Sequence, residues 1–289
     1  MIETRSSSAC EGPVQELPEA AFGSRPGTWP LPTATTPHQL WLRAVAAGGQ
    51  GRYGSAYADL ALLRSQVTAG PLASLAHSTH GSFLRQLGWH TLARGWDGRA
   101  LALAGDDPEA RTDALVGLAA DALGVGRFAA ATALLMRADA ALADALQSGL
   151  LPALTADRLA VRRRWVGAEL AMASGDGATA VTRAEEAVGL ANTTHSGTGA
   201  LLRHRIKSDV VLAAALCSAG AVERARAVAH RALDRSGPLG LTPLRWALAC
   251  LLIDTGNVTV DAQGMREVTD VRDICAGDVQ RAGGTWRTA

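Results

Sequence analysis

The sequence is short of lysine, of aromatic residues and of net charge. Lys207 is the only lysine, so arginine carries nearly all the positive charge, a bias that is typical of GC-rich bacterial genomes. The formal net charge is +1, so no overall field favours nucleic acid or an acidic membrane surface as partner. Aromatic residues make up 4% and hydrophobic residues 48% of the chain. This balance favours closely packed helices over a sheet, and we expect an all-α fold.

The chain also lacks paired cysteines and long apolar runs. Its four cysteines include no C-x-x-C pair, and an all-α chain of this length does not need disulfides. Glu3, Arg5, Glu11 and Glu16 stand where a secretory signal would need apolar residues. No stretch of about 18 apolar residues follows. We therefore expect a cytoplasmic protein that does not enter a membrane.

Motifs for catalysis and cofactors are scarce. No G-x-S-x-G elbow, Walker loop or cluster of Cys and His occurs. Residues 124–129 match G-x-G-x-x-A, but helix formers precede them where a dinucleotide site needs a strand, so we interpret them as a turn. His77 and His80 could bind a metal with His90, although an exposed polar face is the simpler interpretation. The sequence predicts no enzyme, no cofactor and no metal site.

What the chain has is a recurring glycine. Six glycines follow a small residue by seven positions, and five of them precede an alanine by five; the sixth precedes Asp261. The pairs are Ala44 with Gly51, Gly88 with Gly95, Ala119 with Gly126, Ala168 with Gly175, Ala213 with Gly220 and Ala249 with Gly256. Small residues around a turn glycine let two antiparallel helices approach closely. We therefore expect a stack of helical hairpins.

The third repeat carries the fullest pattern. It consists of Leu115, Leu118, Ala119, Ala122, Gly126, Phe128, Ala131, Leu135 and Ala138. This pattern resembles the tetratricopeptide repeat, a helix-turn-helix unit of about 34 residues. The resemblance covers residues 38–275 and implies a right-handed superhelix of about six hairpins with a concave face that grips peptides. The intervals of 44, 31, 49, 45 and 36 residues between the glycines depart from this length, which implies longer helices or inserted loops.

The two ends of the chain differ from the repeats. Six of the eleven prolines fall within the first 37 residues, which argues against regular structure there. We expect a disordered leader over residues 1–37, although Phe22 and Trp29 could dock on the repeats. Residues 276–289 contain Gly277, Gly283 and Gly284, so we expect a frayed tail.

Three tryptophans share one position in different repeats. Trp41, Trp165 and Trp246 each lie ten residues before a turn glycine. Placed strictly by the glycine they fall on the concave face, and shifted by one residue they fall in the core, which is the commoner fate of a tryptophan. Both interpretations stay open. The same phasing places Trp89 on the concave face, one helical turn from Arg85.

Basic residues gather near these tryptophans. Arg162 and Lys207 fall on the concave face opposite Glu169, and further arginines crowd the starts of the same two helices. Because neighbouring repeats pack side by side, such a cluster could bind a carboxylate or phosphate through arginine. Ion pairs to Asp157, Glu169 and Asp209 on a solvated face are the alternative. The expected partner-binding residues are Arg85, Trp89, Arg162, Trp165, Glu169, Lys207 and Trp246.

These patterns predict a class of function. We expect a non-catalytic scaffold or regulatory adaptor that binds a protein or peptide, including one with acidic groups, in a concave groove. The alternative is a sensor that binds a small signal or signalling peptide and switches a partner such as a transcription regulator. Nucleic acid is a weaker candidate because the chain has no net positive charge, although aromatic and arginine side chains together can stack bases. The sequence leaves the oligomeric state open.

Overall fold

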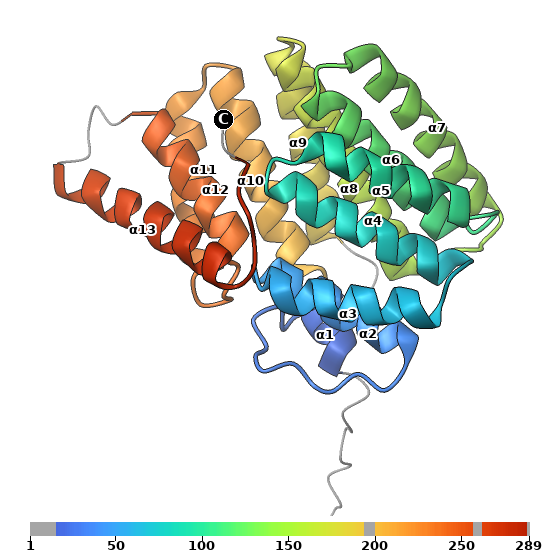
Figure 1. The fold of residues 1–289 in the computed structure, drawn as a ribbon. Coiled ribbons are helices and arrows are strands. Elements are labelled where there is room, and N and C mark those ends of the chain that lie inside the picture. The colour runs from blue at the N-terminus through green and yellow to red at the C-terminus, as the bar shows by residue number, and fades with distance from the viewer. Residues whose placement is uncertain (1–15, 194–199, 257–261, 288–289) are drawn as a thin grey trace, which may run out of the picture.

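The computed structural model describes residues 16–193, 200–256 and 262–287. Over these residues the chain forms helices and no strand, as Figure 1 shows, which confirms the all-α prediction. The helices are α1 (Glu16–Phe22), α2 (Pro37–Gly49), α3 (Tyr53–Gln66), α4 (Pro71–Gln86), α5 (His90–Leu103), α6 (Pro108–Gly124), α7 (Phe128–Gln147), α8 (Ala153–Ala173), α9 (Gly177–Asn192), α10 (Leu202–Ser218), α11 (Val222–Ser236), α12 (Thr242–Asp254) and α13 (Ala262–Arg281). None of the described helices is both long and apolar enough to cross a lipid bilayer.

The helices pack as neighbouring pairs in two layers. Within each pair, such as α6 with α7 and α8 with α9, a short turn reverses the chain and the two helices lie against each other. The even-numbered helices α4, α6, α8, α10 and α12 also contact one another in order along the stack. They form the inner layer, and the odd-numbered helices lie outside them (Figure 1).

Local sequence sets where several helices begin. Pro37 and Pro108 occupy first turns, where the missing amide hydrogen costs nothing. The side chain of Thr36 accepts a hydrogen bond from the Gln39 amide, and that of Asp107 accepts one from the Ala110 amide. These caps satisfy amides that the helix itself leaves free.

Five of the six expected turn glycines are turns. Gly51, Gly126, Gly175, Gly220 and Gly256 all have positive φ, between 59° and 81°. Small residues flank these turns at the expected offsets, and each of them is fully buried. They are Ala44, Ala119, Ala168, Ala213 and Ala249 before the glycines, and Ala56, Ala131, Ala180 and Ala225 after them. The small residues therefore lie where paired helices approach most closely.

The second hairpin differs from the prediction. Gly95 lies inside α5, whereas Gly88, with φ of 89°, forms the turn between α4 and α5. The spacing rule was satisfied twice in this region, because Gly88 also has a small residue seven positions earlier, Gly81, and an alanine five later, Ala93. With Gly88 as the turn, the intervals become 37, 38, 49, 45 and 36 residues, and the second helix of the pair is full length.

The segment before the repeats is ordered where it is described. Helix α1 buries Leu17, Ala20 and Ala21, and the ring of Phe22 lies 5.5 Å from that of Trp41. The side-chain amide of Gln50 donates hydrogen bonds of 2.9 Å to the carbonyl oxygens of residues 26 and 28. The expectation of a disordered leader is therefore wrong for residues 16–37, because apolar residues between the prolines pack on α2. Residues 1–15 lie outside the described residues.

The end of the chain is also packed rather than frayed. Helix α13 continues to Arg281, and residues 282–287 (the tail) then run past the turns at Gly51 and Gly88. The Gly54 amide donates to the Ala282 carbonyl at 2.7 Å, and the Arg287 amide donates to the Leu87 carbonyl at 2.9 Å. The glycines of this segment allow the close approach and do not disorder the segment. The backbone of Gly283 lies against that of Gly54. The tail thus links the last helix pair to the first two (Figure 1).

Candidate binding cavity

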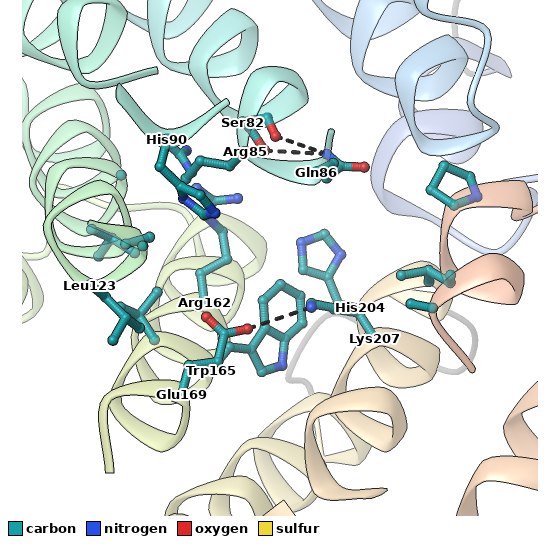
Figure 2. A pocket seen from close by; sticks show the side chains of 18 of the residues that line it. Ser82, Arg85, Gln86, His90, Leu123, Arg162, Trp165, Glu169, His204 and Lys207 are labelled. Atoms are coloured by element: carbon teal, nitrogen blue, oxygen red, sulfur yellow. Dashed lines mark hydrogen bonds and ion pairs between the residues drawn. The ribbon is translucent and has the colours of Figure 1, made fainter. Parts of the chain in front are cut away.

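The inner layer of helices surrounds a cavity of about 330 Å³, shown in Figure 2. Its walls come from α4, α6, α8, α10 and α12, with His90 added at the start of α5. The lining positions repeat from helix to helix: Val116, Trp165 and Trp246 each lie ten residues before a turn glycine. Equal offsets mean that equivalent faces of successive inner helices meet at one cavity.

Six of the seven expected partner-binding residues line this cavity. They are Arg85, Arg162, Trp165, Glu169, Lys207 and Trp246. Trp89 does not line it: it caps the start of α5, and its indole N–H donates to the Thr285 carbonyl at 2.7 Å. The sequence placed Trp89 on the concave face because it used Gly95 as the turn. Counted from Gly88, Trp89 belongs to the turn itself.

The three equivalent tryptophans have different environments. Trp41 is 5% exposed and donates to the Thr79 hydroxyl at 2.9 Å, so it belongs to the core. Trp165 is 9% exposed, donates to the Ser208 hydroxyl at 2.8 Å and lines the cavity. Trp246 is half-buried, and its ring lies 4.2 Å from that of Trp286 in the tail. The core interpretation therefore holds for Trp41, whereas Trp246 lines the cavity.

Two buried carboxyl groups contact the guanidinium of Arg85. It forms an ion pair with Asp97 and another, of 3.0 Å, with Asp121. Burial raises the pKa of Asp97 to about 8, with Arg85 opposing the shift and the nearby charge of Asp121 adding to it. Arg85 therefore has two acidic partners on one side of its guanidinium.

Arg162 also has a carboxylate partner. Its Nε lies 2.9 Å from Asp113 Oδ1, and the same carboxylate accepts a hydrogen bond of 3.2 Å from Arg158. Burial would raise the pKa of Asp113, but Arg162 and Arg158 together hold it at about 2. Arg158 pairs in addition with Glu109 at 2.8 Å.

Across the cavity, Lys207 lies 3.6 Å from Glu169 (Figure 2). Asp209, which the sequence offered as a partner for this basic cluster, pairs instead with Arg235 at 3.0 Å. Ion pairing thus accounts for the charges of Arg85, Arg162, Lys207 and Glu169, which supports the interpretation as ion pairs for those residues.

Arg203 and His204 are among the lining residues that were missing from the expected set. Arg203 faces no carboxylate among the described residues, and its one hydrogen bond runs to the Ala21 carbonyl at 3.4 Å. Burial and the nearby charges of Arg162 and Arg158 together lower the pKa of Arg203 to about 10, so it keeps its charge at neutral pH. His204 stacks on Trp165 with ring centroids 5.3 Å apart. Burial lowers the pKa of His204 well below its usual value, which leaves it neutral.

The sequence contains a pattern that indicates the position of Arg203. Arg203 lies seventeen residues before Gly220, and Arg158 lies seventeen before Gly175, so both occupy one equivalent position at the start of an inner helix. The sequence identified this basic cluster but not which of its members lacks an acidic partner. That depends on contacts with α1 and α2, far away in the sequence.

The histidines considered as metal ligands are packed against an indole. The ring of His80 stacks on Trp96 at 3.8 Å, and the ring of His77 lies 5.4 Å from it. Within the described ranges, no group of three or more His, Cys, Asp or Glu side chains is arranged to hold a metal ion.

The fold and the cavity together define an all-helical chain with a cationic, tryptophan-lined cavity enclosed by its inner helices. Comparison with models of known protein families and with proteins of curated function finds no match to the chain. The arguments for function therefore rest on the geometry of the cavity.

Proposed function

We propose that this chain is a non-catalytic regulatory protein that binds a small signal or a short peptide in its central cavity. In this proposal the helix pairs form a right-handed superhelix of about six tetratricopeptide-like hairpins, and the concave face of that superhelix is the cavity. A bound ligand would change how the protein contacts a partner in the cytoplasm.

The convergence of the inner-helix faces on one cavity carries the proposal. Trp165 and Trp246 supply apolar surface there, and Arg162 and Lys207 supply charge. They come from three inner helices, α8, α10 and α12. An apolar pocket with a few convergent polar groups is the usual form of a ligand site.

The size of the cavity and the position of the tail favour a sensor over an open scaffold. Its volume of about 330 Å³ lies at the small end of the range for ligand sites. The tail joins the last helix pair to the first two, so an extended polypeptide has less room to lie along the whole inner layer. A scaffold that grips a long peptide remains the second candidate, supported by the repeated offsets of the lining residues.

Filling the cavity tests the proposal. Ala120 lines it on α6, so Ala120→Trp should occupy the space without removing an existing contact. Ala140→Trp on the exposed face of α7 is the matched control. We expect peptides or metabolites below about 1 kDa, isolated from the native cells, to raise the melting temperature saturably in the wild type and in Ala140→Trp, but not in Ala120→Trp. A protein that takes up no such ligand while it captures long polypeptides through this face would contradict the sensor.

A further inference from the structure

Arg203 stands apart from the other cations of the cavity wall. Arg85 faces Asp121, Arg162 faces Asp113, and Lys207 faces Glu169. Among the described residues no carboxylate faces Arg203, which lines the same cavity. The carbonyl of Ala21 satisfies one of its five N–H donors, and that bond is long.

Among the described residues, the other cations at the cavity therefore have acidic partners and Arg203 does not. Arg158, behind the wall, pairs with Glu109 and Asp113. Both histidines of the wall, His90 and His204, have pKa values lowered by burial and are neutral. What remains is the guanidinium of Arg203.

An unpaired, largely buried guanidinium is costly in the free protein. Desolvation of a charge without a counter-ion destabilises the folded state. Functional sites carry such costs because the ligand supplies the missing partner. Arg203 is also held in place, since its side chain packs over Gly49, where a Cβ would come within 2.9 Å of its Cδ.

The rest of the wall is apolar and aromatic. Trp165 and His204 form a stacked pair, and Trp246 and Leu244 of α12 also line the cavity. Val116 and Val166 contribute aliphatic surface from α6 and α8. These surfaces suit a ring or a compact apolar group.

We propose that the cavity binds a small monocarboxylate with an apolar, ring-sized body, its carboxylate on Arg203 and its body against Trp165 and Trp246. The inference rests on the proposed function and names the ligand class for the same cavity. A planar guanidinium matches a carboxylate in bidentate geometry. A single carboxylate supplies the one acidic partner that Arg203 lacks, whereas a dianion would bring a second negative charge into a cavity that Glu169 also lines.

Three probes of one shape test the charge requirement. 2-Naphthoate is a monoanion, 2-naphthamide is neutral and 2-naphthyl phosphate is largely dianionic at about pH 8. We expect 2-naphthoate to raise the melting temperature saturably, the amide to have no effect and the phosphate to bind at least tenfold more weakly. Equal binding of the amide, or tighter binding of the phosphate, would overturn the proposal. A dipeptide such as N-acetyl-Ala-Phe that binds far more tightly than 2-naphthoate would assign the carboxylate to a peptide end and overturn the small-acid claim.

Replacing the arginine separates a binding role from a structural role. Arg203→Met should raise the melting temperature of the free protein by about 2 °C or more, because the unpaired charge is removed, and should weaken 2-naphthoate binding at least tenfold. The matched control is Arg137→Met on the exposed face of α7, which should change neither quantity. A lower melting temperature with unchanged 2-naphthoate affinity would make Arg203 structural and overturn the proposal.

A second variant covers the case in which Arg203→Met fails to fold. Arg203→Lys keeps the charge but loses the bidentate geometry, so it should fold and bind 2-naphthoate about tenfold more weakly. Unchanged affinity in Arg203→Lys would contradict the carboxylate contact. If 2-naphthoate does not bind but Ala120→Trp still blocks another small ligand, this inference fails and the proposed function stands. If neither 2-naphthoate nor another small ligand binds in the cavity, both this inference and the proposed function fail.

Discussion

The indole N–H of Trp89 donates a hydrogen bond of 2.7 Å to the carbonyl oxygen of Thr285, 196 positions later in the chain. Backbone hydrogen bonds from Gly54 to Ala282 and from Arg287 to Leu87 flank this contact. The next tail residue, Trp286, stacks on Trp246 of the cavity wall. The tail therefore fixes the position of α12 relative to α3 and α4.

Removing the tail tests this link. A chain that ends at Arg281 loses three hydrogen bonds to the first two helix pairs and uncovers the ring of Trp246. We expect the melting temperature to fall by several degrees and the tryptophan emission to shift to longer wavelength. An unaltered melting temperature in this deletion would show that the tail contributes no stability.

The hydrogen bond from Trp89 to Thr285 can be tested by itself. Trp89→Phe keeps most of the ring but loses the N–H, and should cost about 1 kcal/mol in the full chain. In the chain that ends at Arg281 the same substitution should cost much less, because the acceptor is gone. Equal costs in both backgrounds would place the effect elsewhere.

Replacing the two candidate turn glycines with alanine should change the stability in opposite directions. Gly88 has φ of 89°, so Gly88→Ala should destabilise the protein by about 1 to 2 kcal/mol. Gly95 lies inside α5 with open space where a Cβ would be placed, so Gly95→Ala should stabilise it by about 0.5 to 1 kcal/mol. Urea denaturation followed by circular dichroism measures both. The reverse order would restore Gly95 as the turn.

The equivalent tryptophans should differ in the cost of truncation. Trp41 is enclosed in the core and donates to Thr79, so Trp41→Ala should cost about 3 to 5 kcal/mol. Trp165→Ala should cost less, because one side of the ring faces the cavity, and Trp246→Ala should cost least. Trp29, 43% exposed, is the control, and its replacement should cost less than about 1 kcal/mol. A Trp246→Ala cost equal to that of Trp41→Ala would place both rings in the core.

The raised pKa of Asp97 predicts a pH dependence. Its pKa is about 8 in the folded protein and 3.8 in its ordinary state, so the folded protein binds more protons over this range. Stability from this group is complete below about pH 4 and is lost as the pH rises to about 8. Asp97→Asn should therefore flatten the fall in melting temperature between about pH 5 and 8. Arg85, Asp121 and Arg162 stay in place around it.

The control for this prediction is Asp106→Asn, because Asp106 is exposed. It should show the same fall in melting temperature as the wild type over that range. If Asp97→Asn keeps the full slope, Asp97 does not hold its proton at neutral pH.

The sequence predicted those parts of the fold that depend on local spacing. A turn glycine and its small neighbours act within one hairpin, so the turns at Gly51, Gly126, Gly175, Gly220 and Gly256 were identified correctly. The second hairpin was wrong because two glycines satisfied the same rule. Trp165 and Trp246 share one offset from their turns and Arg162 and Lys207 share another, and all four line the cavity because equal offsets give equivalent faces. Arg85 lines the cavity although it was placed by Gly95, which is not a turn.

What the sequence could not provide were contacts between distant segments. The burial of Asp97 and its pairing with Arg85 depend on α4, α5 and α6 meeting at one point, where Gly81 and Gly117 leave room for the carboxylate. The docking of α1 and of the tail depends on surfaces that exist only after the repeats have stacked. Composition rich in proline or glycine indicated disorder for both, although the apolar residues among them, such as Leu17 and Trp286, are packed.

The hydrogen bond between Trp89 and Thr285 also bears on how the chain folds. In an open array of repeats each unit contacts only its neighbours, so folding can begin anywhere and the ends can unravel separately. Here a contact across 196 residues joins the last unit to the second, and closing so large a loop carries an entropic cost before the contact forms. We expect the tail to dock as a late, slow kinetic phase, and the terminal helices to exchange their amide hydrogens at nearly the rate of the central ones.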